Sequence, residues 1–112
     1  MNGQLSEMQC VARSTAVDQA AIAALLAQVP GWAVEDGLLG KNFAFHDYYQ
    51  TLAFVNALAF LTHAQDHHPE LIITYNTCTV RYSTHSVGGL SENDFICAAK
   101  ADALYQSAAG RA

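Results

Sequence analysis

Residues 47–65 have the sequence DYYQTLAFVNALAFLTHAQ, an apolar stretch with helical spacing. Apolar side chains recur there every three or four residues and form one wide face, which predicts the helix that fills the core. That face consists of Leu52, Val55, Leu58, Ala59 and Leu61. Asp47 is the expected N-cap, with Gln50 three residues later. Pro69 disfavours helical backbone at the residue before it, so we expect the helix to end near Gln65.

Hairpin and helix signals lie on both sides of this segment. Asp36-Gly37 separates residues 32–35 from 38–45 and predicts a two-residue hairpin turn. Residues 71–75 and 78–84 are rich in β-formers and predict a second hairpin, around Asn76-Thr77.

Two further helices are predicted, one near each end of the chain. The first runs over residues 16–29 after a Thr15 cap, and the second opens at Ser91 with Asp94 three residues on. The predicted order is therefore α-β-β-α-β-β-α. We expect an α+β fold, an antiparallel four-stranded sheet with helices on one face. Residues 1–14 are polar and aperiodic and are expected to form a flexible N-terminal tail, leaving residues 15–112 as one domain.

Composition excludes several classes of protein. The 112 residues are 52% hydrophobic and 13% charged, which suits one small domain and excludes a disordered chain. So low a charge fraction also indicates that apolar residues lie in a subunit interface. The net charge is −5 and the few basic residues are scattered, so nucleic-acid binding is not expected. Three cysteines without a CxxC motif indicate reduced thiols in the cytosol, and neither a signal peptide nor a membrane span is expected.

Four of the five histidines lie close together in the sequence. They are His63, His67, His68 and His85. With Asn76-Thr77 as the turn, antiparallel pairing places His85 opposite His68, so the histidines converge at one end of the sheet. Three interpretations remain open on these residues alone: a solvated surface rim, a transition-metal site, or general acid–base catalysis. Because His67 and His68 are adjacent, they are awkward ligands for one tetrahedral ion.

The residues around these histidines form a spaced set. The strings are Asp66-His67-His68-Pro69-Glu70, Tyr75-Asn76, Ser83-Thr84-His85 and Gly89-Leu90-Ser91-Glu92-x-Asp94. This set resembles the pterin-4a-carbinolamine dehydratase family, some of whose members double as dimerization cofactors of a homeodomain transcription factor. The resemblance extends from about Pro30-Gly31-Trp32 to the last predicted helix.

The resemblance implies a lyase, specifically a hydro-lyase, that uses neither cofactor nor metal. It implies dehydration of 4a-hydroxytetrahydropterin to quinonoid dihydropterin, in tetrahydrobiopterin recycling. By analogy, His67 and His85 transfer protons, and His68 binds substrate and stabilises charge. Trp32 is either an aromatic that stacks on the pterin or a core tryptophan.

One residue departs from the family pattern, and two others have roles that the resemblance does not fix. His63 occupies a position where many members of the family carry glutamate, which we expect to change the local charge. Asp94 either caps the last helix or supports the site, and Tyr75 is expected to pack rather than react.

The expected partners are the pterin substrate, further copies of the chain in a homodimer or homotetramer, and an aromatic amino acid hydroxylase in the same pathway. Neither direct nucleic-acid contact nor membrane association is expected, and the expected location is cytoplasmic. The alternative function is a non-catalytic binding, assembly or transcriptional-cofactor module on the same fold.

Overall fold

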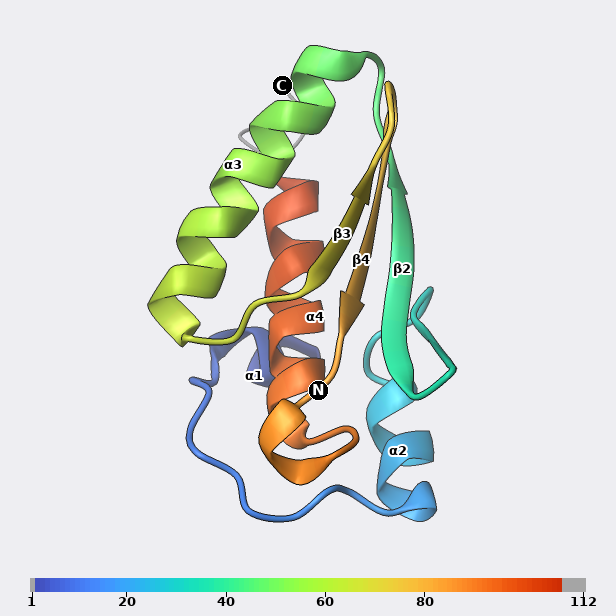
Figure 1. Cartoon of the computed structure of the whole chain (residues 1–112), viewed down its shortest axis with the longest axis vertical. Helices are drawn as coiled ribbons and strands as arrows, with labels where there is room; N and C mark the ends of the chain where they lie inside the picture. The colour runs from blue at the N-terminus through green and yellow to red at the C-terminus, as the bar shows by residue number, and fades with distance from the viewer. Residues whose placement is uncertain (1, 108–112) are drawn as a thin grey trace.

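The computed structural model describes residues 2–107 (Figure 1). In chain order the elements are α1 (Asn2–Glu7), α2 (Gln19–Leu26), β1 (Ala33–Glu35), β2 (Leu38–Ala44), α3 (Tyr48–Gln65), β3 (Glu70–Ile73), β4 (Thr77–Tyr82), the 3₁₀ turn η1 (His85–Val87) and α4 (Glu92–Gln106). This is an α+β fold, as the sequence predicts. Helix α1 and the turn η1 are additions to the predicted order.

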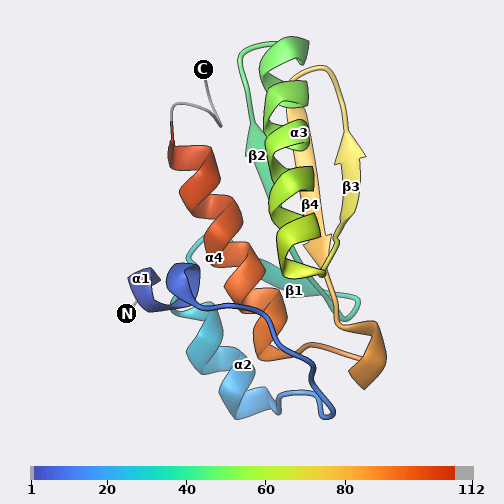
Figure 2. The same ribbon diagram turned by 90° about the vertical axis from the view of Figure 1, so that its left-hand side faces the viewer.

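The four strands form one antiparallel sheet in the order β1-β2-β4-β3. Side chains of β4 alternate, with Cys78, Val80 and Tyr82 fully buried and the residues between them partly exposed. Helices α3 and α4 cover the buried face (Figures 1 and 2). The sheet therefore has one covered face, as predicted, and the two hairpins meet where β2 pairs with β4.

Local signals place most element ends where the sequence predicts them. The Asp47 carboxylate accepts the Gln50 backbone N–H at 2.9 Å, and α3 ends at Gln65. Asp36 and Gly37 both have positive φ, at 54° and 78°, which is the backbone that a tight two-residue hairpin turn requires. The cap predicted for the last helix is also present, at the start of α4.

The second hairpin differs from its predicted register. Glu70 pairs with Arg81 and Ile73 with Cys78, so the turn is Tyr75-Asn76, one residue earlier than expected. The strands also end before the histidines on either side. The expectation that His85 lies opposite His68 within a strand pair is therefore wrong.

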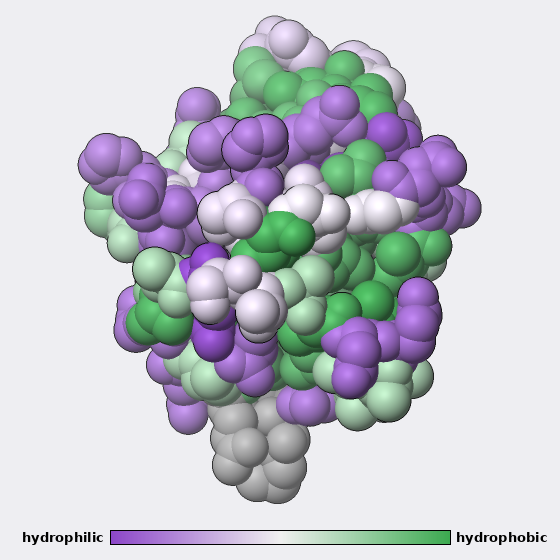
Figure 3. Space-filling view, turned by 60° about the horizontal axis from the view of Figure 1, so that its bottom comes forward, coloured by the Kyte–Doolittle hydropathy of each residue, from purple (hydrophilic) through white to green (hydrophobic). Residues whose placement is uncertain are grey.

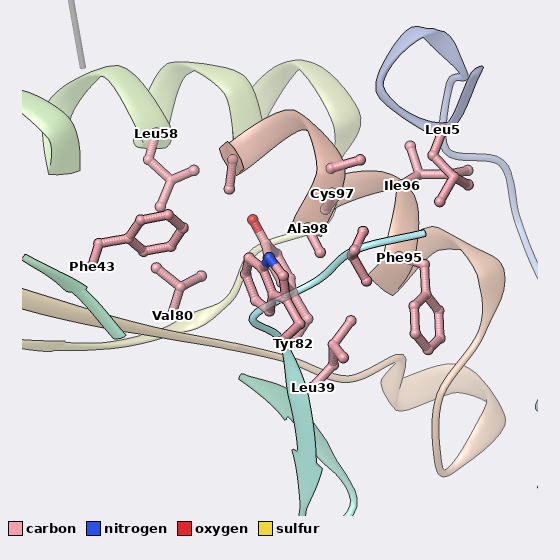
Figure 4. Close-up of a cluster of buried hydrophobic side chains, with 14 of the residues drawn as sticks. Leu5, Leu39, Phe43, Leu58, Val80, Tyr82, Phe95, Ile96, Cys97 and Ala98 are labelled. Carbon is pink, nitrogen blue, oxygen red and sulfur yellow. The ribbon is translucent and has the colours of Figure 1, made fainter. Parts of the chain in front are cut away.

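The N-terminal residues are arranged differently from the expected tail. Residues 2–7 form α1, whose Leu5 is 3% exposed and joins the core beside Ile96 of α4 (Figure 4). Residues 8–18 follow as an extended segment to α2. Helix α2 begins at Gln19, later than predicted, because Asp18 rather than Thr15 provides its cap.

The core lies between the sheet and the helices α3 and α4. Its largest fully buried side chains include Phe43, Phe54, Tyr82 and Phe95. Figure 4 shows residues of the sheet and of α4 meeting in this cluster. No helix within residues 2–107 combines the length and apolarity needed to cross a membrane.

Candidate active site

His67 lies directly after a sharp change of chain direction at the end of α3. Asp66 adopts left-handed backbone (φ 52°), and the backbone N–H of His67 donates to the Thr62 carbonyl at 3.1 Å. A left-handed residue at this position ends a helix and turns the chain back across its last turn. The imidazole of His67 consequently lies against the core, with its side chain 11% exposed.

Asp94 makes hydrogen bonds with both of its carboxylate oxygens. Oδ1 accepts from Nε2 of His67 at 2.6 Å. Oδ2 accepts from the Ser91 backbone N–H at 2.9 Å and from the Thr84 hydroxyl at 2.8 Å. Ser91 Oγ lies 2.7 Å from Thr84 Oγ1 and donates to it, since the Thr84 proton is directed to Asp94. The carboxylate, which is fully buried, therefore caps α4 and holds His67 at the same time.

The contact with Asp94 changes the ionisation of His67. The hydrogen bond and the negative charge of Asp94 raise the pKa of His67 above its usual 6.5, although partial burial opposes the shift. With Nε2 held by Asp94, Nδ1 is the ring nitrogen left for a ligand. This nitrogen makes no hydrogen bond within residues 5–107 and is not fully buried, so it is accessible from the cavity side of the ring. The arrangement thus presents an imidazole of fixed orientation that can give or take a proton at Nδ1.

Tyr82 supports the other side of the imidazole. Its ring is stacked on that of His67, with centroids 5.8 Å apart and planes 11° from parallel. The Tyr82 hydroxyl is the one buried side-chain polar atom within residues 5–107 that lacks a hydrogen-bond partner. Burial raises the pKa of Tyr82 well above its ordinary value, so the phenol stays protonated.

A cavity of about 250 Å³ lies beside the His67–Asp94 pair. One wall comes from the segment Cys10–Arg13, and the other comes from the end of α3 and the region around η1, including His67, Thr84 and Ser86. Figure 3 turns the lower end of the molecule in Figure 1 toward the viewer, where hydrophilic and hydrophobic side chains are intermixed. The cavity brings an imidazole, hydroxyls and the Arg13 guanidinium to one place.

The other three histidines of the predicted set lie on the surface. His63 is on the last turn of α3, His68 follows His67, and His85 begins η1, directly after Thr84. Within residues 2–107, no hydrogen bond or ion pair joins these three side chains to the His67–Asp94 pair. The structure thus brings His67 and Asp94 into contact and leaves His63, His68 and His85 exposed around them.

Trp32 has the surroundings of a core side chain. It is 6% exposed, and its Nε1–H donates to Asp102 Oδ2 at 3.0 Å. Asp102 also pairs with Lys41 Nζ at 2.8 Å. The indole packs against Phe43 and Tyr82, with centroids 5.9 and 6.1 Å away. A stacking role toward a pterin stays a prediction.

Tyr75 lies in the β3–β4 turn and is 64% exposed, with its ring stacked on that of Tyr48. Among residues 2–107, no group of three or more His, Cys, Asp or Glu side chains is placed to hold a metal ion.

Several contacts of the site could not be predicted from the sequence, although Thr84 itself belongs to one of the strings that resemble the family. Thr84 contacts Asp94 across a loop closed by its backbone hydrogen bonds to Gly89, and no periodic pattern predicts that pairing. The wall formed by Cys10–Arg13 comes from the segment expected to be a tail. The Ser91-x-x-Asp94 spacing is the one signal that could have suggested a buried carboxylate here.

Comparison with known proteins gives consistent matches. The sequence model of the family described as "Pterin 4 alpha carbinolamine dehydratase" matches residues 15–104. A protein of Stenotrophomonas maltophilia (strain K279a) is 52% identical over 105 residues, covering 89% of this chain and 90% of that protein. A protein of Xanthomonas campestris pv. campestris (strain B100) is 54% identical over 106 residues, covering 90% of both. Both carry the provisional name pterin-4-alpha-carbinolamine dehydratase.

Two solved structures are also similar. A Brucella melitensis protein described as a transcriptional coactivator/pterin dehydratase superposes with a TM-score of 0.76 at 28% identity, covering 80% of this chain and 97% of that one. A pterin dehydratase-like protein identified as a RuBisCO assembly factor in the alpha-carboxysome gives a TM-score of 0.58 at 31% identity. That match covers 69% of this chain and 89% of the other.

Proposed function

Because the chain belongs to the pterin 4 alpha carbinolamine dehydratase family, we propose that it is a hydro-lyase that dehydrates 4a-hydroxytetrahydropterin to quinonoid dihydropterin. The observation that carries this proposal is the His67–Asp94 pair beside the cavity. An imidazole fixed at one nitrogen and open at the other is suited to proton transfer. We further propose that residues 15–112 form the family domain, against which α1 and the Cys10–Arg13 wall pack. The proposed pathway is tetrahydrobiopterin recycling.

The reaction needs two proton transfers. The C4a–O bond breaks while a proton reaches the departing hydroxyl, and a ring nitrogen loses a proton as the C4a–N double bond forms. The products are water and the dihydropterin, so neither a redox partner nor a metal is required. In this proposal His67, whose pKa is raised by Asp94, is the group that protonates the leaving hydroxyl.

His85 and His68 complete the proposed site. His85 follows Thr84, whose hydroxyl donates to Asp94, so it is anchored next to the pair through the backbone. We assign His85 to the proton taken from the ring, and His68 to binding the pterin and stabilising charge. Trp32 and His63 remain supporting candidates, with His63 standing on the last turn of α3 in place of the usual glutamate.

A binding or assembly role is the second candidate function. One observation favours it: Tyr49 and Phe60 on α3 are 79% and 78% exposed. Their spacing of eleven residues, about three helical turns, puts both rings on one stripe of the helix. Exposed aromatic side chains of this kind are typical of protein interfaces. We propose that this stripe packs against other protein surfaces, including further copies of the chain in a homodimer or homotetramer. Similar proteins described as a RuBisCO assembly factor and as a transcriptional coactivator/pterin dehydratase support a role with other partners.

The cysteines and the net charge bear on where the chain works and what it binds. Three free cysteines suit a reducing cytoplasm, and the net charge of −5 does not favour nucleic acid. An aromatic amino acid hydroxylase is the expected supplier of the substrate, because such enzymes release the 4a-hydroxylated pterin.

The direct test is dehydration of enzymatically generated 4a-hydroxytetrahydropterin by the purified chain, followed by absorbance at neutral pH. We expect acceleration over the spontaneous reaction, and a loss of about 10²–10⁴-fold in kcat for His67→Ala. His46→Ala is the matched control, because His46 is an exposed histidine before α3 that does not line the cavity. A wild-type rate equal to the spontaneous one would remove the enzyme proposal and favour the binding role.

A further inference from the structure

We propose that Cys10 and Cys97 form a redox-active dithiol that reacts with hydroperoxides and closes to an intramolecular disulfide. Their sulfur atoms lie 3.4 Å apart, although the residues are 87 positions apart in the sequence. Cys10 is partly exposed and lines the cavity beside His67, whereas Cys97 is buried on α4 (Figure 4). One thiol is therefore open to a small oxidant and the other lies behind it. This proposal does not depend on the dehydratase reaction.

Hydrogen bonds hold the segment that carries Cys10 in place. The Cys10 backbone N–H donates to Gln65 Oε1 at 2.8 Å, which ties the segment to the end of α3. Asn93, near the start of α4, donates from Nδ2 to the Val11 carbonyl at 2.7 Å and accepts the Val11 N–H at 3.2 Å. Arg13 Nε also donates to Asn93 Oδ1, at 3.0 Å. These contacts on both sides of Cys10 keep its sulfur against that of Cys97.

The two thiols differ in acidity. A hydrogen bond from the Cys97 thiol lowers the pKa of Cys10 to about 7, helped by the positive charges of His67, Lys100 and Arg13 and opposed by burial. The same hydrogen bond and burial raise the pKa of Cys97. At neutral pH Cys10 is therefore the attacking thiolate and Cys97 the resolving thiol.

Cys78 provides an internal comparison. It is fully buried on β4, and burial raises the pKa of its thiol to about 11. Thiolate is the reactive form of cysteine, so Cys78 is expected to stay reduced under conditions that oxidise Cys10. The chain thus contains a reactive pair and an inert thiol of the same residue type.

Oxidation of the Cys10–Cys97 pair proceeds in two steps. The Cys10 thiolate attacks the terminal peroxide oxygen, an S–O bond forms, the O–O bond breaks, and the departing alkoxide or hydroxide takes a proton. The Cys97 sulfur then attacks the Cys10 sulfenic sulfur, and the Cys97 proton leaves with the displaced hydroxide as water. Two thiols and one hydroperoxide give one disulfide, one alcohol (or water) and one water, with two electrons passing from sulfur to oxygen.

Closure would link two elements covalently next to the cavity. The bond would attach the Cys10–Arg13 wall to α4 one turn from Asp94, because Cys97 follows Asp94 by three residues in that helix. A disulfide that closes so long a loop restricts the unfolded chain. We therefore expect the oxidised form to melt at least about 5 °C above the reduced form.

The test is treatment of the reduced full chain with a slight excess of hydrogen peroxide at pH 7, followed by intact mass and by peptide mapping without reductant. We expect a loss of about 2 Da, a Cys10–Cys97 cross-linked peptide, and a return to the starting mass with dithiothreitol. Cys78→Ser is the matched control and should behave in the same way. Cys10→Ser and Cys97→Ser should each lose the cross-link.

The wild-type peptide map decides the proposal even where a variant fails to fold. A gain of oxygen without any cross-link would overturn it, as would a bond to Cys78 or a disulfide between two chains. As a second measurement, iodoacetamide at pH 7 should alkylate Cys10 of the reduced wild type at least about tenfold faster than Cys78. Equal rates at the two positions would also contradict the proposal.

Discussion

A carboxylate that accepts a hydrogen bond from an imidazole N–H sets both the orientation and the basicity of the ring. In this chain Asp94 does so for His67 while its second oxygen accepts two further hydrogen bonds. The carboxylate is thereby fixed before any substrate binds. Such preorganisation is what a proton-transfer group requires, because little rearrangement is needed during the reaction.

The contact between His67 and Asp94 should control how the imidazole titrates. Replacing Asp94 with Asn should lower the pKa of His67, because both the hydrogen bond to a carboxylate and the negative charge are lost. NMR titration of the imidazole resonances measures this directly, with His46 as the internal reference. An unchanged His67 titration in a folded Asp94→Asn protein would show that the contact does not form in solution.

The same contact predicts how stability depends on pH. A pKa that is raised in the folded state means that the folded protein binds the proton more tightly than the unfolded chain. The stabilisation is fully present below the unfolded pKa of about 6.5 and is lost as the pH rises through the folded pKa. The difference in unfolding free energy between wild type and Asp94→Asn should therefore be larger at pH 5.5 than at pH 8.5, as measured by urea denaturation.

The exposed histidines have separable predicted effects. His85→Ala should lower kcat by about 10²–10⁴-fold, since His85 is assigned a proton transfer. The double variant with His67→Ala should lose less than the product of the single losses. His68→Ala should mainly raise KM, and His63→Ala should be mild. Steady-state kinetics separates these outcomes, and a His85→Ala protein with wild-type kcat would reassign the second proton.

At the scale of elements, the start of α4 joins fold stability to the site. Ser91 accepts from the Asn93 N–H, and its own hydroxyl donates to Thr84, which in turn donates to Asp94. Ser91→Ala should cost about 1–2 kcal/mol of unfolding free energy, because a cap and a buried hydrogen bond are lost together. Urea denaturation measures this. The control is Ser14→Ala, an exposed serine, which should change stability by less than about 0.5 kcal/mol.

Turns show where sequence patterns suffice and where they do not. Asp36-Gly37 was predictable because a two-residue hairpin turn needs positive φ, which glycine and aspartate tolerate. Neither Tyr75 nor Asn76 has positive φ, so the second turn lacks that constraint. Asn favours a turn without fixing its own position within it. Backbone and hydroxyl contacts between Thr74 and Thr77 set the register instead.

At the scale of the whole molecule, long-range contacts account for what the sequence did not predict. The motif spacing identified His67 and Asp94 as candidates, but their contact depends on how α3 and α4 pack on the sheet. Asp94 was weighed as either a cap or a supporting residue, and its two oxygens make both kinds of contact. The wall at Cys10–Arg13 depends on hydrogen bonds to the side chains of Asn93 and Gln65, which leave no periodic pattern in the sequence.

The exposed stripe on α3 predicts self-association. Phe60→Lys places a charge in the proposed interface and should shift the chain toward its 12.0 kDa monomer in sedimentation velocity at micromolar concentration. Ala23→Lys, at an exposed position of α2, is the matched control and should leave the distribution unchanged. A wild type that sediments as a monomer would instead contradict the homo-oligomer.

In the proposed reaction His67, oriented by Asp94, transfers a proton during dehydration of a 4a-hydroxytetrahydropterin. The most direct test is the pH dependence of kcat/KM for wild type and His67→Ala, with His46→Ala as control. We predict a bell-shaped profile for the wild type and the control, and for His67→Ala a loss of about 10²–10⁴-fold together with one limb of the bell. A folded His67→Ala protein that keeps the wild-type kcat/KM at every pH would contradict proton transfer by His67.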